Sequence, residues 1–251
     1  MNIKRKINEN INNLDLNLYP ENIIELEIEI KENNQNIKII NNNLFNKENT
    51  ILFINKIKTQ FNNNIKIENK GNYNLLLLNN NKLENLSKLF KDSKEINKII
   101  FHKFNTENVT GIYYMFDDCS SLTSIDVSKF STEKVITMSG MFDGCSSLKS
   151  IDVSKFNTEN VTKMYYMFSG CSALKSIDVS KFNIEKVTDM SSMFKYCSAL
   201  KSIDVSNFNT EKVENINSMF SSCSKLTSIN ISNFYTKNVK DIEYILIFVH
   251  I

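Results

Sequence analysis

Cysteine is the residue type whose spacing in this chain is most suggestive of chemistry. Five cysteines recur at intervals of 26 residues, from Cys119 to Cys223. Zinc needs four ligands that converge tetrahedrally, usually from closely spaced pairs, and the sequence contains no C-x-x-C motif. Disulfides between neighbouring repeats are disfavoured because side chains at one repeat position point in parallel directions. We therefore expect a column of buried thiols that act as small hydrophobic side chains.

Aspartate recurs at the same interval and forms a second candidate site. Asp126, Asp152, Asp178 and Asp204 each stand in the pattern S-I-D-V-S, whose alternation predicts a short strand with its polar residues outside. Three interpretations are open: a solvated acidic stripe, a protein-binding surface and a cation site. Like charges one strand spacing apart, about 4.8 Å, repel by only about 0.9 kcal/mol in water, so the column does not need a metal. We expect no metal site here.

The other reactive residue types form no catalytic pattern. Methionines such as Met138 and Met141 recur at core-like spacing, which favours core filling over soft-metal binding. The two histidines, His102 and His250, lie outside the regular repeats, so a catalytic cysteine would lack a base. The sequence contains no P-loop, G-x-G-x-x-G, nucleophile elbow or H-E-x-x-H motif. We expect a protein without enzymatic activity and without a cofactor.

Composition narrows the classes of partner. The 251 residues are 41% hydrophobic, and 30 Lys and Arg nearly balance 28 Asp and Glu. This balance gives no electrostatic footprint for nucleic acid or an anionic membrane. The longest apolar runs, Leu75 to Leu78 and Tyr244 to Ile251, are too short to insert across a bilayer, and the first residues lack the apolar core of a signal peptide. We expect an intracellular protein, with export to the cell surface by a non-classical route as the alternative.

The 26-residue interval runs through most of the sequence and defines a repeat. Its unit reads L-x-S-I-D-V-S-x-F-x-T-x-x-V-x-x-M-x-x-M-F-x-x-C-S. A fixed period of this size predicts a solenoid or array, because one unit cannot bury its apolar face alone. In the second half of the unit, Val135, Met138, Phe142 and Cys145 are three, four and three residues apart. That spacing fits a helical stripe or a short extended piece followed by one turn, and both remain open.

A degenerate repeat precedes the regular ones. Phe90 and Ile99 match Phe116 and Ile125 one interval later. Because repeats at the ends of an array are often atypical, we count this segment as part of the array. We expect about six coils over residues 81–251.

The N-terminal part of the chain lacks the repeat. Residues 1–80 contain runs of alternating apolar and β-branched residues, a pattern typical of strands. Because the end of an array needs a cover for its core, we expect a β-rich capping domain rather than a free-standing binding domain. The expected strands are Ile23–Ile30, Ile37–Ile40, Ile51–Lys58 and Tyr73–Leu78.

The repeat motif resembles a known family. L-x-S-I-D-V-S-x-F-x-T followed by V-x-x-M-x-x-M-F-x-x-C-S is similar to the BspA-like leucine-rich repeat proteins, and in particular to their branch with 26-residue surface-protein repeats. The resemblance implies a right-handed leucine-rich-repeat solenoid with a parallel sheet along one side. It also implies a role in adhesion or in binding host or matrix proteins.

Together these features predict an α/β solenoid with 26-residue coils, a parallel β-sheet face and a small β-rich N-terminal cap. We expect a non-enzymatic protein-interaction or adhesion-type scaffold that binds an unidentified protein partner over the exposed sheet face. The alternative is a structural protein that self-assembles as a homodimer through its apolar end at residues 244–251. The expected partner-binding residues are Ser124, Asp126, Ser150, Asp152, Ser176, Asp178, Ser202 and Asp204.

Overall fold

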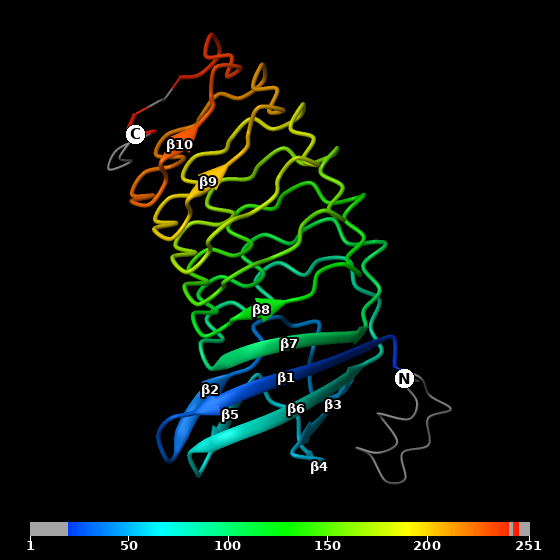
Figure 1. Cartoon of the computed structure of the whole chain (residues 1–251). Coiled ribbons are helices and arrows are strands. Elements are labelled where there is room, and N and C mark those ends of the chain that lie inside the picture. The colour runs from blue at the N-terminus through cyan, green and yellow to red at the C-terminus, as the bar shows by residue number, and fades with distance from the viewer. Residues whose placement is uncertain (1–19, 241–242, 246–251) are drawn as a thin grey trace.

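Strands dominate the first part of the described chain, and turns dominate the rest (Figure 1). The computed structural model describes residues 20–240 and 243–245. Over these residues there is no helix, and hence no helix that could cross a bilayer. The strands are β1 (Asn22–Ile30), β2 (Gln35–Lys38), β3 (Thr50–Ile54), β4 (Ile57–Thr59), β5 (Asn64–Ile67), β6 (Gly71–Asn79), β7 (Ile96–Lys103), β8 (Ser124–Ile125), β9 (Ser202–Ile203) and β10 (Ser228–Ile229).

A six-stranded sheet organises the N-terminal part, in the order β4-β3-β6-β1-β7-β8. Strand β1 is antiparallel to β6 and β7, and β7 is parallel to β8. Along β1, Ile24, Leu26 and Ile28 are buried and alternate with glutamates, so one face of the sheet lies on the core. Because β7 and β8 belong to successive repeats, the sheet continues from the N-terminal segment into the repeats (Figure 1).

The expected N-terminal strands are largely confirmed. Two of them match β1 and β6, and the expected strand at Ile37–Ile40 overlaps β2. The run Ile51–Lys58 contains β3 and the start of β4, which form a hairpin, instead of a single strand. Asn55 and Lys56 turn the chain there with φ angles of 47° and 72°. The sequence interpretation misses β5 and β7, and the domain boundary after residue 80 stays a prediction.

Successive 26-residue repeats lie on one another, so that equivalent residues form columns (Figure 1). Phe90 stacks on Phe116, and Ile99 is in register with Ile125, which confirms the degenerate first repeat. Along the column from Phe90 to Phe220, neighbouring ring centroids are 5.2 to 5.6 Å apart and the ring planes differ by at most 9°. The methionine column is buried beside these rings, as expected, in one apolar core that extends into the N-terminal sheet.

In the second half of each repeat, backbone N–H groups bond alternately to the next repeat and within their own repeat. Positive φ angles recur at two positions four residues apart, for example 60° at Gly140 and 68° at Gly144. The N–H of Gly140 donates to the carbonyl of Tyr165 in the next repeat, whereas the N–H of Met141 donates to Met138 in its own repeat. An α-helix needs successive N–H groups to bond four residues back in the same segment. The alternation therefore excludes a helix and bonds each repeat to the next.

The prediction of an α/β leucine-rich-repeat solenoid is wrong. The described residues contain no helix, and their sheets are mixed: one is largely antiparallel, and two others have only two strands each. Of the S-I-D-V-S segments, two form only the two-residue strands β8 and β9, and those at Ser150 and Ser176 form none, while the S-I-N-I-S segment that follows them forms β10. A continuous parallel sheet and a closed α/β solenoid are therefore not found in the described chain. The physical reason is that the backbone bonds between repeats come mainly from the turns.

Candidate interaction surfaces

The Ser-Asp column, defined as the eight predicted partner-binding residues from Ser124 to Asp204, lies on the surface. All eight residues are exposed. Each aspartate also has a local role. Asp126 Oδ1 accepts the backbone N–H of Ser128 at 2.9 Å, and the same bond recurs at 2.9 Å in the three following repeats. This bond closes an Asx turn after each short extended segment, and partner binding by the column stays a prediction.

The Asx turns of the Ser-Asp column do not depend on the negative charge of its aspartates. Hydrogen bonds lower the pKa of all four aspartates, first from the hydroxyl of the serine two residues later and, for Asp178, first from that serine's backbone N–H. The four carboxylates are therefore ionised at neutral pH. In the next repeat, Asn230 takes this position and its amide oxygen accepts the N–H of Ser232 at 3.1 Å. The turn needs an acceptor but not a negative charge.

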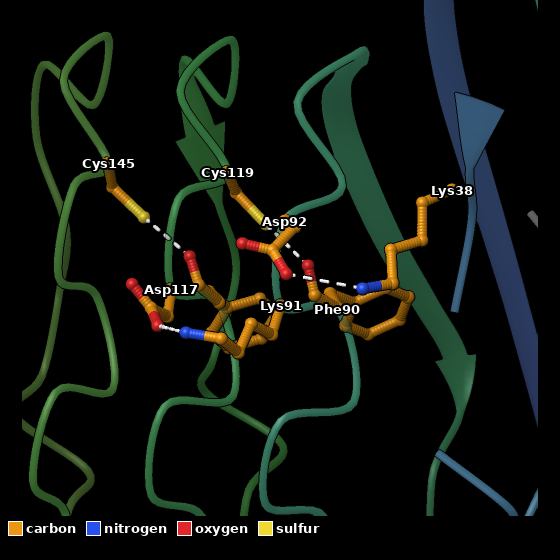
Figure 2. A network of polar contacts seen from close by, with 8 residues as sticks. Lys38, Phe90, Lys91, Asp92, Asp117, Cys119 and Cys145 are labelled. Atoms are coloured by element: carbon orange, nitrogen blue, oxygen red, sulfur yellow. Dashed lines mark hydrogen bonds and ion pairs between the residues drawn. The ribbon is translucent and has the colours of Figure 1, made fainter. Parts of the chain in front are cut away.

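The cysteine column is buried, which confirms the expected buried thiols. The thiol of Cys119 donates to the carbonyl of Phe90 over 3.1 Å, and Cys145 makes the same bond to Phe116 (Figure 2). Burial raises the pKa of all five thiols, that of Cys223 to about 12. The thiols are therefore protonated at neutral pH and are poor nucleophiles and metal ligands.

Charged residues join the N-terminal segment to the first repeats (Figure 2). The Lys91 ammonium forms an ion pair with Asp117 of the next repeat, and this hydrogen bond raises the pKa of Lys91. Beside it, Lys38 Nζ of β2 lies 3.2 Å from Asp92 Oδ2. The two ion pairs hold these side chains in place, with Asp117 buried and the other three partly exposed.

Asp143 continues the Lys91–Asp117 column by one repeat, and Lys91, a cation near it, is paired with Asp117 instead. In the described part of the chain, no lysine or arginine forms an ion pair with the Asp143 carboxylate. Burial raises the pKa of Asp143 to about 6, with a contribution from Asp117 and Asp118, while a hydrogen bond from Ser169 and the charge of Lys91 oppose the shift. No group of three or more His, Cys, Asp or Glu in the described residues is arranged to hold a metal ion.

Four tyrosines form a chain of edge-to-face contacts near these carboxylates. The ring centroids of Tyr113 and Tyr114 are 6.1 Å apart, and those of Tyr165 and Tyr166 are 6.0 Å apart. Tyr114 and Tyr165 join the two pairs at 6.5 Å. That contact crosses an intervening repeat because Gly140 lacks a side chain, and a Cβ atom there would lie only 2.2 Å from the Tyr114 ring. We call this set of four residues the tyrosine cluster.

Comparison with known proteins identifies a family but not an activity. A family model described as "Mycoplasma protein of unknown function, DUF285" matches residues 55–177 and again residues 167–248, which together are well over half of the chain. The chain belongs to this family. No curated protein and no solved structure matches it significantly. DUF285 membership thus supports a repeat protein, and the finer resemblance to the BspA-like branch stays a prediction.

The tyrosine cluster is the part of the surface that sequence reasoning missed. Its signal lies in the two residues before each M-F pair, which read YY, SG, YY, SS and NS in successive repeats. The core positions around them hardly change. Among the repeats of this DUF285 chain, these two positions vary while the fold stays the same, and the tyrosines there are partly exposed or, at Tyr166, exposed.

Two further expectations concern histidine and the C-terminal end. His102 Nε2 lies 2.7 Å from Glu25 Oε2, away from the cysteine column, and His250 lies outside the described residues. Of the proposed homodimer segment 244–251, residues 246–251 also lie outside them. Tyr244 is exposed, and the carbonyl of Ile245 accepts the N–H of Phe220.

Proposed function

We propose that the protein is a non-enzymatic interaction scaffold of the adhesion type, with the Ser-Asp column as its contact surface for a protein partner. One observation carries the proposal. Four ionised aspartates occupy the same exposed position in successive repeats, although Asn230 serves the same turn without a charge. The turn forms without the charge, so the repetition of the charge favours a surface role in addition to its local contribution to the fold.

The stacking of the repeats supports this role. Backbone bonds between repeats and the stacked phenylalanine rings hold the column in one arrangement. A rigid surface loses little conformational entropy on binding, so many modest contacts add up to a useful affinity. The contact we propose is with a surface that carries lysine, arginine or hydroxyl groups.

The reactive residues also favour a scaffold over an enzyme. The cysteines are buried and protonated, and His102 contacts Glu25 instead of a thiol. A nucleophile and its base need to lie within hydrogen-bond reach of each other. Binding of a partner through the exposed Ser-Asp column does not require a nucleophile and a base.

The test removes charge from the column while keeping its turns. Asp152→Asn with Asp178→Asn retains an acceptor for each serine N–H, and the control is Glu159→Gln with Glu185→Gln on exposed positions of the same repeats. We expect proteins captured from source cells by the wild-type chain and by the control to be lost with the aspartate variant, measured by quantitative mass spectrometry. Equal capture by both variants would refute the proposal.

A further inference from the structure

We propose that Asp143, Tyr165 and Tyr166 form a binding site for a lysine or arginine side chain of a basic protein segment. The inference rests on the proposed function in taking the partner to be a protein. It concerns a different surface, however, because these residues lie in the turn half of the repeat and not in the Ser-Asp column. Charge complementarity and a precedent within the chain support it.

The first tyrosine pair already binds lysines of its own chain. Lys88 Nζ lies 5.6 Å from the centroid of the Tyr113 ring, and Lys91 Nζ lies 5.3 Å from that of Tyr114. Lys91 is at the same time paired with Asp117. An ammonium over an aromatic face with a carboxylate beside it is a favourable cation–π arrangement.

The second tyrosine pair lacks these lysines. It stands two repeats after the first pair, so its cations would come from the residues two repeats after Lys88 and Lys91. Those residues are Gly140 and Asp143. In the described part of the chain, no ammonium group lies over either ring of the second pair.

The second pair is accessible to a partner and has an acidic residue where the first pair has a basic one. The Tyr166 side chain is 38% exposed, and Tyr165 and Asp143 are partly exposed. Asp143 stands where the first pair has a lysine, and its carboxylate forms no ion pair within the described residues. A lysine or arginine from a partner would find there the kind of aromatic faces that Lys88 and Lys91 find two repeats earlier. Its carboxylate would be Asp143, at the position of Lys91, because the position of Asp117 is taken by Ser169.

The experiment uses a fluorescein-labelled hexalysine peptide and the full chain, with binding followed by fluorescence anisotropy at low salt. We expect the peptide to bind, and its fully acetylated form to bind at least fivefold more weakly because acetylation removes the charge. Tyr165→Leu with Tyr166→Leu should weaken binding at least fivefold, and so should Asp143→Asn. Tyr166→Phe should retain binding because it keeps the ring.

Matched variants separate this site from other surfaces. Tyr235→Leu removes a tyrosine that is 42% exposed in a later repeat and should leave the affinity unchanged. Glu159→Gln with Glu185→Gln removes two carboxylates at exposed positions outside both surfaces and should also leave it unchanged. The tyrosine variants keep the Ser-Asp column intact, so failure of this site and failure of that column are told apart.

A gain-of-lysine variant keeps the proposal testable even if the leucine variant does not fold. Asp143→Lys puts a lysine at the position equivalent to Lys91 and should block the peptide by covering the ring. No binding of hexalysine, equal binding of the acetylated peptide, or full binding by the Asp143 variants would each overturn the proposal.

Discussion

At the residue scale, the surroundings of two nearby aspartates, Asp143 and Asp152, shift their pKa values in opposite directions. Asp152 is fully exposed, and hydrogen bonds from the Ser154 hydroxyl and N–H lower its pKa. Asp143 is partly buried, and its burial beside Asp117 raises its pKa to about 6. Solvation and hydrogen bonding therefore decide which carboxylate stabilises the fold when ionised and which one opposes it.

The raised pKa of Asp143 predicts a pH-dependent stability. An unfolded aspartate has a pKa of about 3.9, so between about pH 4 and pH 6 the folded chain holds more protons at this site than the unfolded chain. The contribution of Asp143 to wild-type stability should then rise as the pH falls through this window. We expect Asp143→Asn to be more stable than wild type at pH 7 and the difference to shrink toward pH 4, as measured by urea unfolding.

The control for this experiment is Asp152→Asn, which should behave in the opposite way. The stabilisation from Asp152 is present above its unfolded pKa and is lost as the pH falls through its lowered folded pKa. The variant should be less stable than wild type near neutral pH and equal to it in strong acid. In the comparison of wild type with Asp143→Asn, the neighbouring Asp117, Asp118, Lys91 and Tyr114 are the same in both chains. If the stabilities of wild type and Asp143→Asn changed with pH in the same way, the raised pKa of Asp143 would be contradicted.

At the scale of the element, the turn half of each repeat bears backbone strain. Its two positive-φ positions carry glycine at Gly140, Gly144 and Gly170, but tyrosine, serine or aspartate in most other repeats. A left-handed conformation costs a residue with a Cβ atom roughly 1–2 kcal/mol. The repeat tolerates this cost because the conformation directs alternate N–H groups to the next repeat.

Two substitutions in one column test this account. Gly170→Ala should lower the free energy of unfolding by about 1–2 kcal/mol, because φ is 69° and the new Cβ would lie 3.2 Å from the backbone nitrogen of Gly144. Ser222→Gly, where φ is 62°, should raise it by about 0.5 kcal/mol, since relief of strain exceeds the entropy cost of glycine. Urea unfolding measures both. Equal losses in the two variants would show that the positive φ angle carries no strain.

At the scale of the whole molecule, β1 couples the N-terminal segment to the repeats. It lies between β6 and β7, and its buried Ile24 and Leu26 belong to the same apolar core as Leu226. Without β1, the backbone of β7 would become the open edge of a sheet beside uncovered apolar side chains. Such an edge promotes pairing between chains.

Removal of residues 1–80 should therefore make the repeats self-associate. We expect a larger mass from light scattering for the truncated chain, in units of its own monomer, than for the full chain at the same molar concentration. Ile100→Lys places a charge on the partly exposed face of β7 and should reduce the association. A truncated chain that stays monomeric and unfolds at the same urea concentration as the full chain would contradict the coupling.

The sequence by itself determined the features that depend on local pattern. The 26-residue interval, the buried cysteine, methionine and phenylalanine columns and the exposed Ser-Asp column all follow from which residue types recur at which positions. Strands β1 and β6 were predictable for the same reason, because their alternation of apolar and polar side chains shows within a few residues.

Only the tertiary structure decided the conformation of the turns and the assembly of the tyrosine cluster. The spacing of Met138, Phe142 and Cys145 fits a helix and also fits the observed turns. The choice depends on backbone bonds to a repeat about 25 residues later, which no local pattern contains. Likewise, the rings of Tyr114 and Tyr165 meet because stacking brings them together over Gly140. Contacts between repeats thus determine the turn conformation and the ring contacts, which the sequence of a single repeat does not determine.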